Sequence, residues 1–327
     1  MAFDELLNDL EKRRRQVLAM GGPDKLARRR ASGALNARER IAYLFDQDSF
    51  IESGLFATSA YPQDRERSPA DGKLAGFGKI HGREAAVVAN DFTVMGASSS
   101  ATNMKKIGHM KRTAVSRGIP LVMLGESSGA RLPDNMGARG MGSLLAQDPQ
   151  QYLRLRESPW VSAALGLCYG SSTWYCVLAD FNVMRKGAII AVSSSLLASL
   201  AMNDTVNAEE LGGWRVHAEV TGFADMVVDS DEQAIDAVKT FLSYLPGNNS
   251  EAPPLKPVPA GSGDRIKDIL NILPQSRTQV YDMRKILQCI VDRDSWFELK
   301  PRFGKAGVTA LARLDGKTVG VIANNPL

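Results

Sequence analysis

Residues 119–131, IPLVMLGESSGAR, join a short apolar run to a turn that is rich in small residues. The apolar run at 119–124 is bounded by glycine on both sides, at Gly118 and Gly125. Short apolar runs with such boundaries are typical of strands that are buried on both faces of a parallel sheet. The stretch therefore predicts a buried strand that ends in a tight turn.

The same alternation extends through the chain on either side of this stretch. Further strands are predicted at 85–90, 161–168, 188–193 and 223–228, and helices near 99–117, 137–155, 172–184 and 231–244. Gly118 is well placed to cap the helix at 99–117, because glycine accepts the left-handed conformation that ends many helices. Strands that alternate with helices in this way predict an α/β fold built on a parallel sheet.

Two of the predicted turns are candidates for a ligand site. Residues 125–131, GESSGAR, follow one strand, and residues 166–172, GLCYGSS, lie at the end of another. In parallel sheets, ligands bind where strands end and helices begin. Small residues let a ligand approach the backbone, and free N–H groups at a helix start stabilise a negatively charged oxygen. Because such turns are common, the pattern alone is a weak signal.

The chain contains an internal repeat. Residues 38–52, RERIAYLFDQDSFIE, align without gaps with residues 284–298, RKILQCIVDRDSWFE. Residues 79–90, KIHGREAAVVAN, match residues 313–324, RLDGKTVGVIAN, and each predicts a hairpin that turns at a glycine. Two matches in the same order indicate a duplication.

The repeat predicts how the chain is organised. A proline-rich stretch at 246–264 is interpreted as a linker between a first domain at 1–245 and the beginning of a second, homologous domain at 265–327. The second copy lacks a counterpart of residues 94–245, so we expect a fragment or a naturally short chain. The last segment is too small to bury a stable core alone, and we expect it to pack on the first domain.

Charge and composition limit the possible functions. The 40 basic and 36 acidic side chains give a net charge of +4, and residues 1–40 account for all of the excess. Basic clusters at 12–15 and 28–30 are interpreted as a solvated helix surface, or as a contact for a polyanion such as the phosphates of coenzyme A. No aromatic side chains are interleaved with the small excess, which disfavours nucleic acid. No apolar run is long enough for a membrane-spanning helix.

Cysteine and histidine usage points away from metal and nucleophile chemistry. The three cysteines form no Cys-x-x-Cys pair, which predicts no metal site, no disulfide framework and a reducing, cytoplasmic setting. The three histidines accompany no plausible nucleophile or ligand set, and we interpret them as structural.

Seven motifs, in order along the chain, resemble the carboxyltransferase (beta) subunits of biotin-dependent acyl-CoA carboxylases, such as propionyl-CoA carboxylase. They are ARERI at 37–41, NDFTVMG at 90–96, SGAR at 128–131, EELGG at 209–213, LSYLP at 242–246, YDM at 281–283 and VIANNP at 321–326. Agreement in family order over nearly the whole chain makes this resemblance specific.

The resemblance implies a crotonase-like fold of the ClpP/crotonase superfamily, and an enzyme that moves carboxylate from carboxybiotin to the α-carbon of a short or medium acyl-CoA. It implies that the first domain binds the acyl-CoA thioester and that a biotin carboxylase and biotin carrier partner supplies the biotin. It also implies a homo-oligomer, commonly a hexamer. Two main-chain N–H groups would stabilise the thioester enolate, biotin's ureido group would act as the base, and no metal would be needed.

The resemblance also implies site residues. Gly170 and Ser171 match the Gly-Gly pair whose backbone N–H groups form the family's oxyanion hole. Substrate binding is expected from Phe92, Lys106, Ser128, Gly129, Ala130 and Arg131, with Lys106 as a possible phosphate contact or a solvated surface lysine.

The sequence departs from the family at three points. Ser171 replaces the second glycine of the pair, Ser128 replaces a glycine in Ser-Gly-Gly-Ala-Arg, and Ser193-Ser194 replaces a Gly-Pro pair. A backbone N–H survives a glycine-to-serine change if φ stays negative, although the added side chain could crowd the thioester. Altered acyl specificity or lost activity would follow from such crowding.

Three interpretations therefore stay open. The first is a carboxyltransferase subunit, or a part of one that cannot complete turnover without its second half. The second is a free-standing crotonase-like hydratase or decarboxylase, for which Glu126 is the obvious acid or base beside a loop. The third is a truncated or divergent paralogue that binds acyl-CoA without turnover, which the serine substitutions favour over the second.

Overall fold

The structure is a computed structural model that describes residues 2–135 and 156–327. The helix expected at 137–155 falls outside the described residues. The larger sheet consists of β1 (Ile51–Ser53), β2 (Lys73–Ile80), β3 (Arg83–Asn90), β4 (Leu121–Ser127), β5 (Trp160–Tyr169), β6 (Phe181–Arg185), β7 (Ile189–Ala191) and β8 (Met226–Val228).

This sheet is mixed. Its order is β1-β2-β3-β4-β5-β6-β8, and β7 pairs with β5. β1, β2 and β3 pair in antiparallel fashion, whereas every pairing from β3 to β8 is parallel. The predicted α/β fold with a parallel sheet is confirmed for this central part, and the antiparallel edge is the β2–β3 hairpin that the sequence predicts.

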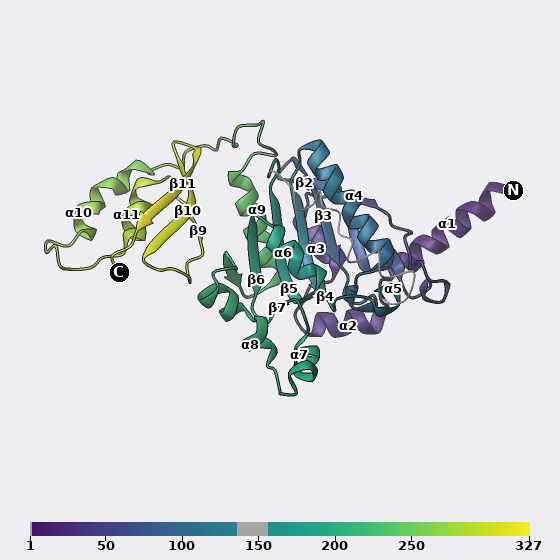
Figure 1. The fold of residues 1–327 in the computed structure, drawn as a ribbon. Helices are drawn as coiled ribbons and strands as arrows, with labels where there is room; N and C mark the ends of the chain where they lie inside the picture. Colours follow the sequence, from purple (N-terminus) through teal and green to yellow (C-terminus); the bar gives the residue numbers. More distant parts are fainter. Residues whose placement is uncertain (1, 136–155) are drawn as a thin grey trace.

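Helices cover both faces of the sheet (Figure 1). On one face, α3 (Ala37–Leu44) and α9 (Asp231–Tyr244) share an apolar core with Val87 and Ala89 of β3. On the other face, α4 (Ala101–Arg117) and the neighbouring α6 (Ser171–Leu178) enclose Ala86 and Val88. Because successive side chains of a strand point to opposite faces, this arrangement explains why the middle of β3, at 85–89, is apolar at every position.

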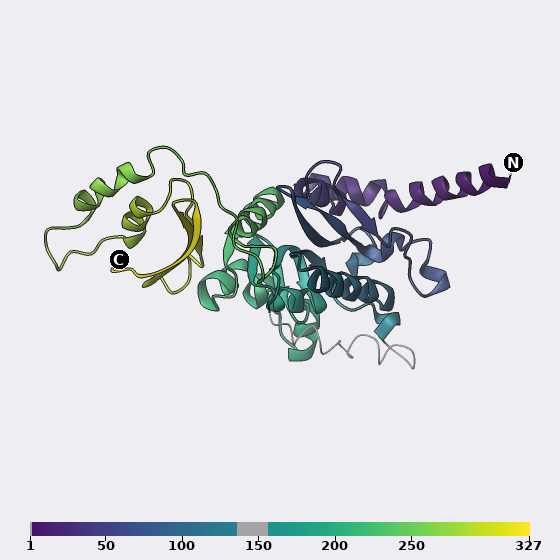
Figure 2. The ribbon, with the colours of Figure 1, turned by 90° about the horizontal axis from the view of Figure 1, so that it is seen from above.

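The remaining helices are peripheral. They are α1 (Ala2–Leu18), α2 (Pro23–Ala31), α5 (Leu132–Asn135), α7 (Ser195–Met202), α8 (Ala208–Gly212), α10 (Ile269–Ile272) and α11 (Met283–Ile290), with single-turn helices at Pro62–Asp64, Pro69–Gly72, Met95–Ala97, Val216–Val220 and Gly263–Asp268. The beginning of α1 projects away from the body of the molecule in both views (Figures 1 and 2). None of the helices in 2–135 and 156–327 is long and apolar enough to cross a bilayer.

Local sequence signals explain the ends of α4. The Ser100 side chain accepts a hydrogen bond from the Asn103 N–H, and the Asn103 side chain accepts one from the Ser100 N–H, which forms a capping box. Gly118 ends the helix in the left-handed conformation, with φ 62° and ψ 44°. The predicted glycine cap is therefore confirmed.

The helix expected at 172–184 is wrong in its second half. The helix α6 ends at Leu178, and the chain re-enters the sheet as β6 at Phe181. The Asp180 N–H donates to the Trp160 carbonyl and its carboxylate accepts from the Trp160 N–H, which aligns the new strand with β5. β6 is buried at four of its five positions and shows no strict alternation of apolar and polar residues, so periodicity cannot distinguish it from a helix.

A second sheet lies at one side of the molecule, beyond α9 (Figure 1). Its strands are β9 (Phe297–Leu299), β10 (Gly307–Leu314) and β11 (Lys317–Asn324), all antiparallel. The Phe297 ring packs between Phe181 and Tyr244 of the first sheet and α9, with centroids 5.6 and 5.9 Å away. The Tyr244 hydroxyl also donates to the Ser295 carbonyl at 2.7 Å. The last segment thus packs on the larger sheet and its helix.

The two copies of the sequence repeat form the same hydrogen bonds. In the first copy, the Asp46 carboxylate accepts from the N–H groups of the hairpin turn residues His81 and Gly82, at 3.0 and 2.7 Å. In the second copy, Asp292 accepts from the corresponding turn, Asp315 and Gly316, at 3.1 and 2.7 Å.

The ion pairs and the turn geometry repeat as well. Arg38 pairs with Glu52, and Arg284 pairs with Glu298, at 2.8 and 2.7 Å. All four turn residues have positive φ, as two-residue hairpin turns of this handedness require. The duplication therefore extends to backbone geometry, while the assignment of domain boundaries stays a prediction.

Candidate active site

The two small-residue turns lie at the same edge of the sheet. β4 and β5 are parallel neighbours, and the register pairs Ser127 with Cys168 close to the ends of both strands. Gly129 and Gly170 are in direct contact, since a Cβ placed on Gly170 would lie 3.6 Å from the Gly129 Cα. Both glycines have positive φ, 99° and 61°, which favours glycine at these positions. The fold therefore joins two turns that are about 40 residues apart in the sequence.

The N–H of Gly170 is not available to a ligand. It donates to the carbonyls of Ala191 and Val192, at 3.3 and 3.2 Å, where the chain leaves β7. This corrects the expectation that Gly170 supplies an oxyanion-hole N–H. The bond arises because β7 pairs with the end of β5, so its last carbonyls extend past the turn.

The N–H of Ser171 is available. Ser171 is the first residue of α6, and within the described part of the chain its N–H donates to no acceptor. Its backbone is helical, so the glycine-to-serine change costs no strain at this position. The Ser171 hydroxyl is tied to the Ser99 hydroxyl, which fixes the added side chain in place. Free N–H groups at the start of a helix favour a negatively charged group.

The turn at 128–131 presents a second main-chain donor. The Ser128 N–H donates to the Gly96 carbonyl, and the Gly129 N–H donates to the Ser127 hydroxyl. Among the described residues, the Ala130 N–H has no acceptor, and Ala130 is exposed. The main chain of Ser99 bonds to Gly129 and Arg131 on either side of Ala130, at 2.8 and 2.9 Å, and so fixes the turn.

Phe92 and Ser128 lie around Gly96. A Cβ on Gly96 would come within 2.6 Å of the Ser128 hydroxyl oxygen and 4.0 Å of the Phe92 ring. Ser128 is exposed and Phe92 is half-buried. The two residues expected to contact substrate therefore border the same turn, with Phe92 as its apolar side chain.

Arg131 and Lys106 are used inside the protein. The Arg131 guanidinium, which is 3% exposed, pairs with Asp71 at 2.6 Å and contacts Ser98. The Lys106 ammonium donates to the carbonyls of Gly54, Ala70 and Lys73. Burial lowers the pKa of Lys106 to about 8. The expected roles of Arg131 in substrate binding and of Lys106 as a phosphate contact stay predictions, and both charged groups already have partners within the protein.

Glu126 is locked in a buried ion cluster. Its carboxylate accepts from Arg29 and from Arg40, and Arg40 is also paired with Asp231 at 2.8 Å. Arg185 completes the cluster through Asp231, at 2.9 Å. The two guanidinium groups occupy this carboxylate, which is therefore poorly placed to exchange protons with a ligand. Glu126 is therefore a structural anchor beside the site and not the acid or base that a hydratase would need.

The histidines supply no general base either. His217 bonds to the Ile190 carbonyl at 2.8 Å, His81 forms the hairpin turn, and His109 lies exposed on α4. Nowhere in the described ranges do three or more metal-binding side chains gather into a possible ion site. The donors at the joined turns are thus main-chain N–H groups.

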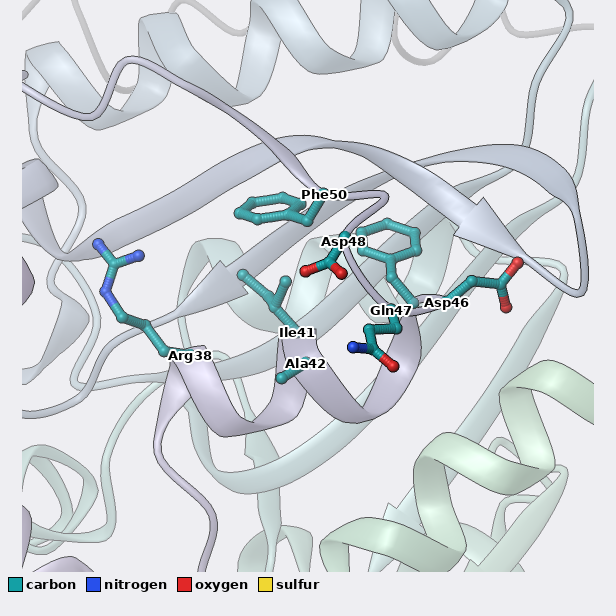
Figure 3. A pocket seen from close by; sticks show the side chains of 8 residues that line it. Arg38, Ile41, Ala42, Asp46, Gln47, Asp48 and Phe50 are labelled. Atoms are coloured by element: carbon teal, nitrogen blue, oxygen red, sulfur yellow. The ribbon is translucent and has the colours of Figure 1, made fainter.

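A separate cavity of about 450 Å³ lies between α3 and the loop that follows it (Figure 3). It borders the hairpin end of β2 and β3, opposite the strand ends that carry Gly129 and Gly170. Two of its charged side chains are engaged in the fold, since Arg38 pairs with Glu52 and Asp46 caps the hairpin. This cavity is therefore a consequence of the repeated helix–hairpin unit and is separate from the joined turns.

Three residues that no sequence motif indicates support the turn at 128–131, namely Asp71, Lys73 and Ser99. Each is at most 2% exposed. Asp71 and Lys73 lie about 60 residues before the turn, and no spacing in the sequence links them to it. Only a charged pair in an otherwise apolar strand start, Asp-Gly-Lys before LAGFG, could have attracted attention.

Comparison with known proteins identifies the fold and its lineage. The family described as carboxyl transferase domain matches residues 28–327. The chain belongs to this family. The match leaves out all of α1 and the first half of α2, and it includes both copies of the internal repeat.

Individual carboxyl transferase relatives cover the whole chain. The chain is 32% identical to the carboxyltransferase subunit of propionyl-CoA carboxylase from Haloferax mediterranei, over 100% of this chain and 64% of that protein. It is 31% identical to the alpha subunit of methylmalonyl-CoA decarboxylase from Veillonella parvula, over 98% of this chain and 64% of that protein. The chain therefore spans about 64% of the length of these carboxyl transferase relatives.

A solved carboxyl transferase structure has the same fold. A transcarboxylase 12S structure, described as a hexamer assembly with hydrolysed methylmalonyl-coenzyme A bound, superposes with a TM-score of 0.89 at 29% identity. The superposition covers 98% of this chain and 64% of that one. The crotonase-like carboxyltransferase fold expected from the sequence is confirmed.

Proposed function

We propose that this chain forms the acyl-CoA side of a carboxyltransferase, which moves carboxylate between carboxybiotin and the α-carbon of a short or medium acyl-CoA. The observation that carries the proposal is the Ser171 N–H at the start of α6, which has no acceptor among the described residues and lies beside the turn whose Ala130 N–H likewise has none there. In this proposal, Ser171 and Ala130 take the oxyanion role, and Gly170 shapes the turn between them.

The proposed chemistry matches this pair of donors. When the α-proton leaves an acyl-CoA, negative charge develops on the thioester oxygen, and fixed N–H donors stabilise that charge most. The enolate carbon then forms a bond to the carbon dioxide that carboxybiotin releases, and the ureido nitrogen left by that release takes the proton. Carboxybiotin is a substrate of this reaction, delivered by a partner, so the chain itself needs no acid or base.

The occupied side chains support the same conclusion. Glu126 is held by Arg29 and Arg40, and none of the three histidines lies free at the joined turns. A hydratase would require a positioned acid or base there. A decarboxylation of the type named for one relative uses the same enolate and the same main-chain donors, so it falls within this proposal.

The proposed partners follow from the family. We propose a biotin carrier or biotin carboxylase subunit as the source of carboxybiotin, and self-association into an oligomer. The transcarboxylase relative is described as a hexamer assembly. A reducing, cytoplasmic location stays an expectation, and it agrees with three buried cysteines that are unbridged.

A second candidate function is acyl-CoA binding without turnover. One specific observation favours it, because the Gly170 N–H is consumed by Ala191 and Val192 and cannot contribute to an oxyanion hole. The two candidates differ in whether an enolate, and not only coenzyme A, is stabilised.

Replacement of Ser171 tests the proposal directly. Ser171→Pro removes the N–H at the first position of α6, where proline fits a helix well. Ser171→Gly keeps the N–H and removes the hydroxyl, so it is the matched control. We expect Ser171→Pro to lower carboxylation of propionyl-CoA by about a hundredfold, measured with a biotin carboxylase partner and free biotin, and Ser171→Gly to stay within a few-fold of the parent.

Circular dichroism would verify that both variants fold. Equal activity of Ser171→Pro and Ser171→Gly would refute the oxyanion role. Calorimetry that shows binding of coenzyme A, but no tighter binding of an anionic mimic of the enolate, would support the binding-only alternative.

A further inference from the structure

The segment that precedes β2 has an unusual backbone. Ala70, Asp71 and Gly72 are three consecutive residues with positive φ, at 50°, 50° and 69°. Ala70 and Asp71 are non-glycine residues, for which this conformation costs on the order of 1 kcal/mol or more each. Both are almost fully buried, at 2% and 0% exposure. Strain of this kind persists only where the surrounding contacts impose it. Here the imposing contacts are those of the Asp71 and Lys73 side chains.

Asp71 connects two loops of the site. One carboxylate oxygen accepts from Arg131 at 2.6 Å, and the other accepts from the Ser100 hydroxyl. The Asp71 carbonyl accepts from the Asn103 side chain at 3.1 Å. Arg131 directly follows Ala130, while Ser100 caps α4 and directly follows Ser99. The carboxylate thus holds the C-terminal end of the turn at 128–131 against the start of α4.

Lys73 reaches the other end of the same turn. Its ammonium donates to the Ala97 carbonyl at 2.7 Å, and the Ser127 hydroxyl donates to the same carbonyl at 3.0 Å. The Ser127 oxygen in turn accepts from the Gly129 N–H at 3.1 Å. A fully buried lysine is an expensive way to stabilise a fold, because methionine would fill similar space without a charge to desolvate.

The Ala130 N–H, one of the two proposed oxyanion donors, lies between these two anchors. Asp71 fixes Arg131, Lys73 and Ser127 fix Gly129, and the Ala130 N–H stands between them. Gly129 in turn contacts Gly170, the residue before Ser171. A shift of the turn would therefore move the Ala130 N–H relative to the Ser171 N–H, and donor geometry of this kind must hold to within a fraction of an ångström.

We propose that Asp71 and Lys73 are positioning residues, whose buried side chains hold the Gly129–Arg131 turn so that the Ala130 N–H faces the thioester oxygen together with the Ser171 N–H. This inference rests on the proposed function. It assigns a role to two residues that touch no substrate and belong to no motif of the site.

The test compares two probes on the full chain by calorimetry. One is coenzyme A, and the other is a coenzyme A thioether that ends in a nitro group, whose nitronate anion mimics the thioester enolate. Asp71→Asn and Lys73→Met should each weaken binding of the nitronate about tenfold or more, with binding of coenzyme A changed less than twofold. A merely structural role would weaken binding of both probes equally. Glu84→Gln, in an exposed pair with Arg117, is the matched control.

Asp71→Glu should recover part of the nitronate affinity that Asp71→Asn loses, because it restores the charge that pairs with Arg131. If Asp71→Asn does not fold, Lys73→Met carries the test. Unchanged nitronate affinity in Lys73→Met, with affinity lost in Ser171→Pro, would overturn the positioning role and leave the proposed function standing. If the parent chain binds nitronate no tighter than coenzyme A, the proposed function fails and this inference fails with it.

Discussion

Gly170 and Ser171 are adjacent, yet their main-chain N–H groups serve different purposes. The Gly170 N–H closes onto the end of β7, while the Ser171 N–H remains open at the start of α6. Three charged side chains expected near the site have partners within the protein: Glu126 pairs with Arg40, Arg131 pairs with Asp71, and Lys106 donates to main-chain carbonyls. At this scale, the site consists of backbone donors within a frame of buried charges.

Glu126 tests whether that frame is structural. Glu126→Gln leaves Arg29 and Arg40 without their shared carboxylate, and Arg40 is 0% exposed. Removing one partner from a buried ion pair typically costs about 3–5 kcal/mol of the free energy of unfolding. We expect urea denaturation to show that Glu126→Gln lowers the free energy of unfolding by this amount. A stable variant that has lost all activity would instead show that Glu126 takes part in proton transfer.

Lys73 predicts a pH dependence of stability. Burial lowers the pKa of Lys73 to about 7, and the nearby Arg131 also acts to lower it. The negative groups Asp71, Cys168 and Glu126 act to raise it. Between pH of about 7 and 10, the unfolded chain binds a proton that the folded chain does not, so the free energy of unfolding rises with pH from this group.

The measurement is the difference between the parent and Lys73→Met in urea denaturation across that range. The free energy of unfolding of the parent should rise relative to that of the variant by roughly 1 kcal/mol per pH unit between pH of about 7 and 10. Below about pH 7 the difference between them should stay constant. A constant difference between pH 7 and 10 would show that Lys73 stays protonated in the folded chain.

At the scale of elements, the helix–hairpin unit occurs twice with one set of contacts. In each copy, an aspartate that follows the helix accepts hydrogen bonds from the turn N–H groups of the next hairpin. This residue is Asp46 after α3 and Asp292 after α11. The hairpins differ in surroundings, because β3 continues into a parallel pairing with β4, whereas β11 pairs only with β10 among the described strands. The same local sequence thus forms the same unit in two environments.

This equivalence predicts matched mutational effects. Asp46→Ala and Asp292→Ala each remove the acceptor of two turn N–H groups, so each should lower the free energy of unfolding by about 1–3 kcal/mol. The exposed Asp48→Asn is a suitable control, because asparagine tolerates the positive φ of this position. Urea denaturation measures the effect. A cost at only one of the two positions would show that the turns are held by different contacts.

At the scale of the whole molecule, the final segment depends on the larger sheet. Phe297 of β9 packs with Phe181, Phe241 and Tyr244, and Lys300 pairs with Asp225 at 3.0 Å. The Arg313 guanidinium stacks 4.0 Å from the centre of the Tyr244 ring. The stretch at 246–263 connects the two parts with almost no regular structure of its own.

Phe297→Ala should weaken this junction. Its side chain is 6% exposed, and loss of a buried phenylalanine typically costs about 3–5 kcal/mol. We expect faster hydrogen exchange in β9 to β11 and faster proteolysis in 246–263, with little change in β4 and β5. Ile322→Ala, at an 89% exposed position of β11, should change neither. If Phe297→Ala instead speeds hydrogen exchange equally in both sheets, Phe297 does not act mainly at the contact between them.

The sequence by itself determined the α/β fold, the glycine cap of α4, the two hairpins and the family, because these depend on local periodicity, turn residues and motifs in order. It also located both turns of the candidate site, at Gly129 and Gly170. Only the tertiary structure decided which donors stay free, since the Gly170 N–H is consumed by β7 and the charges of Arg131, Lys106 and Glu126 are taken by distant partners. Those outcomes depend on contacts between residues far apart in the chain, and no local pattern encodes which donor and acceptor meet.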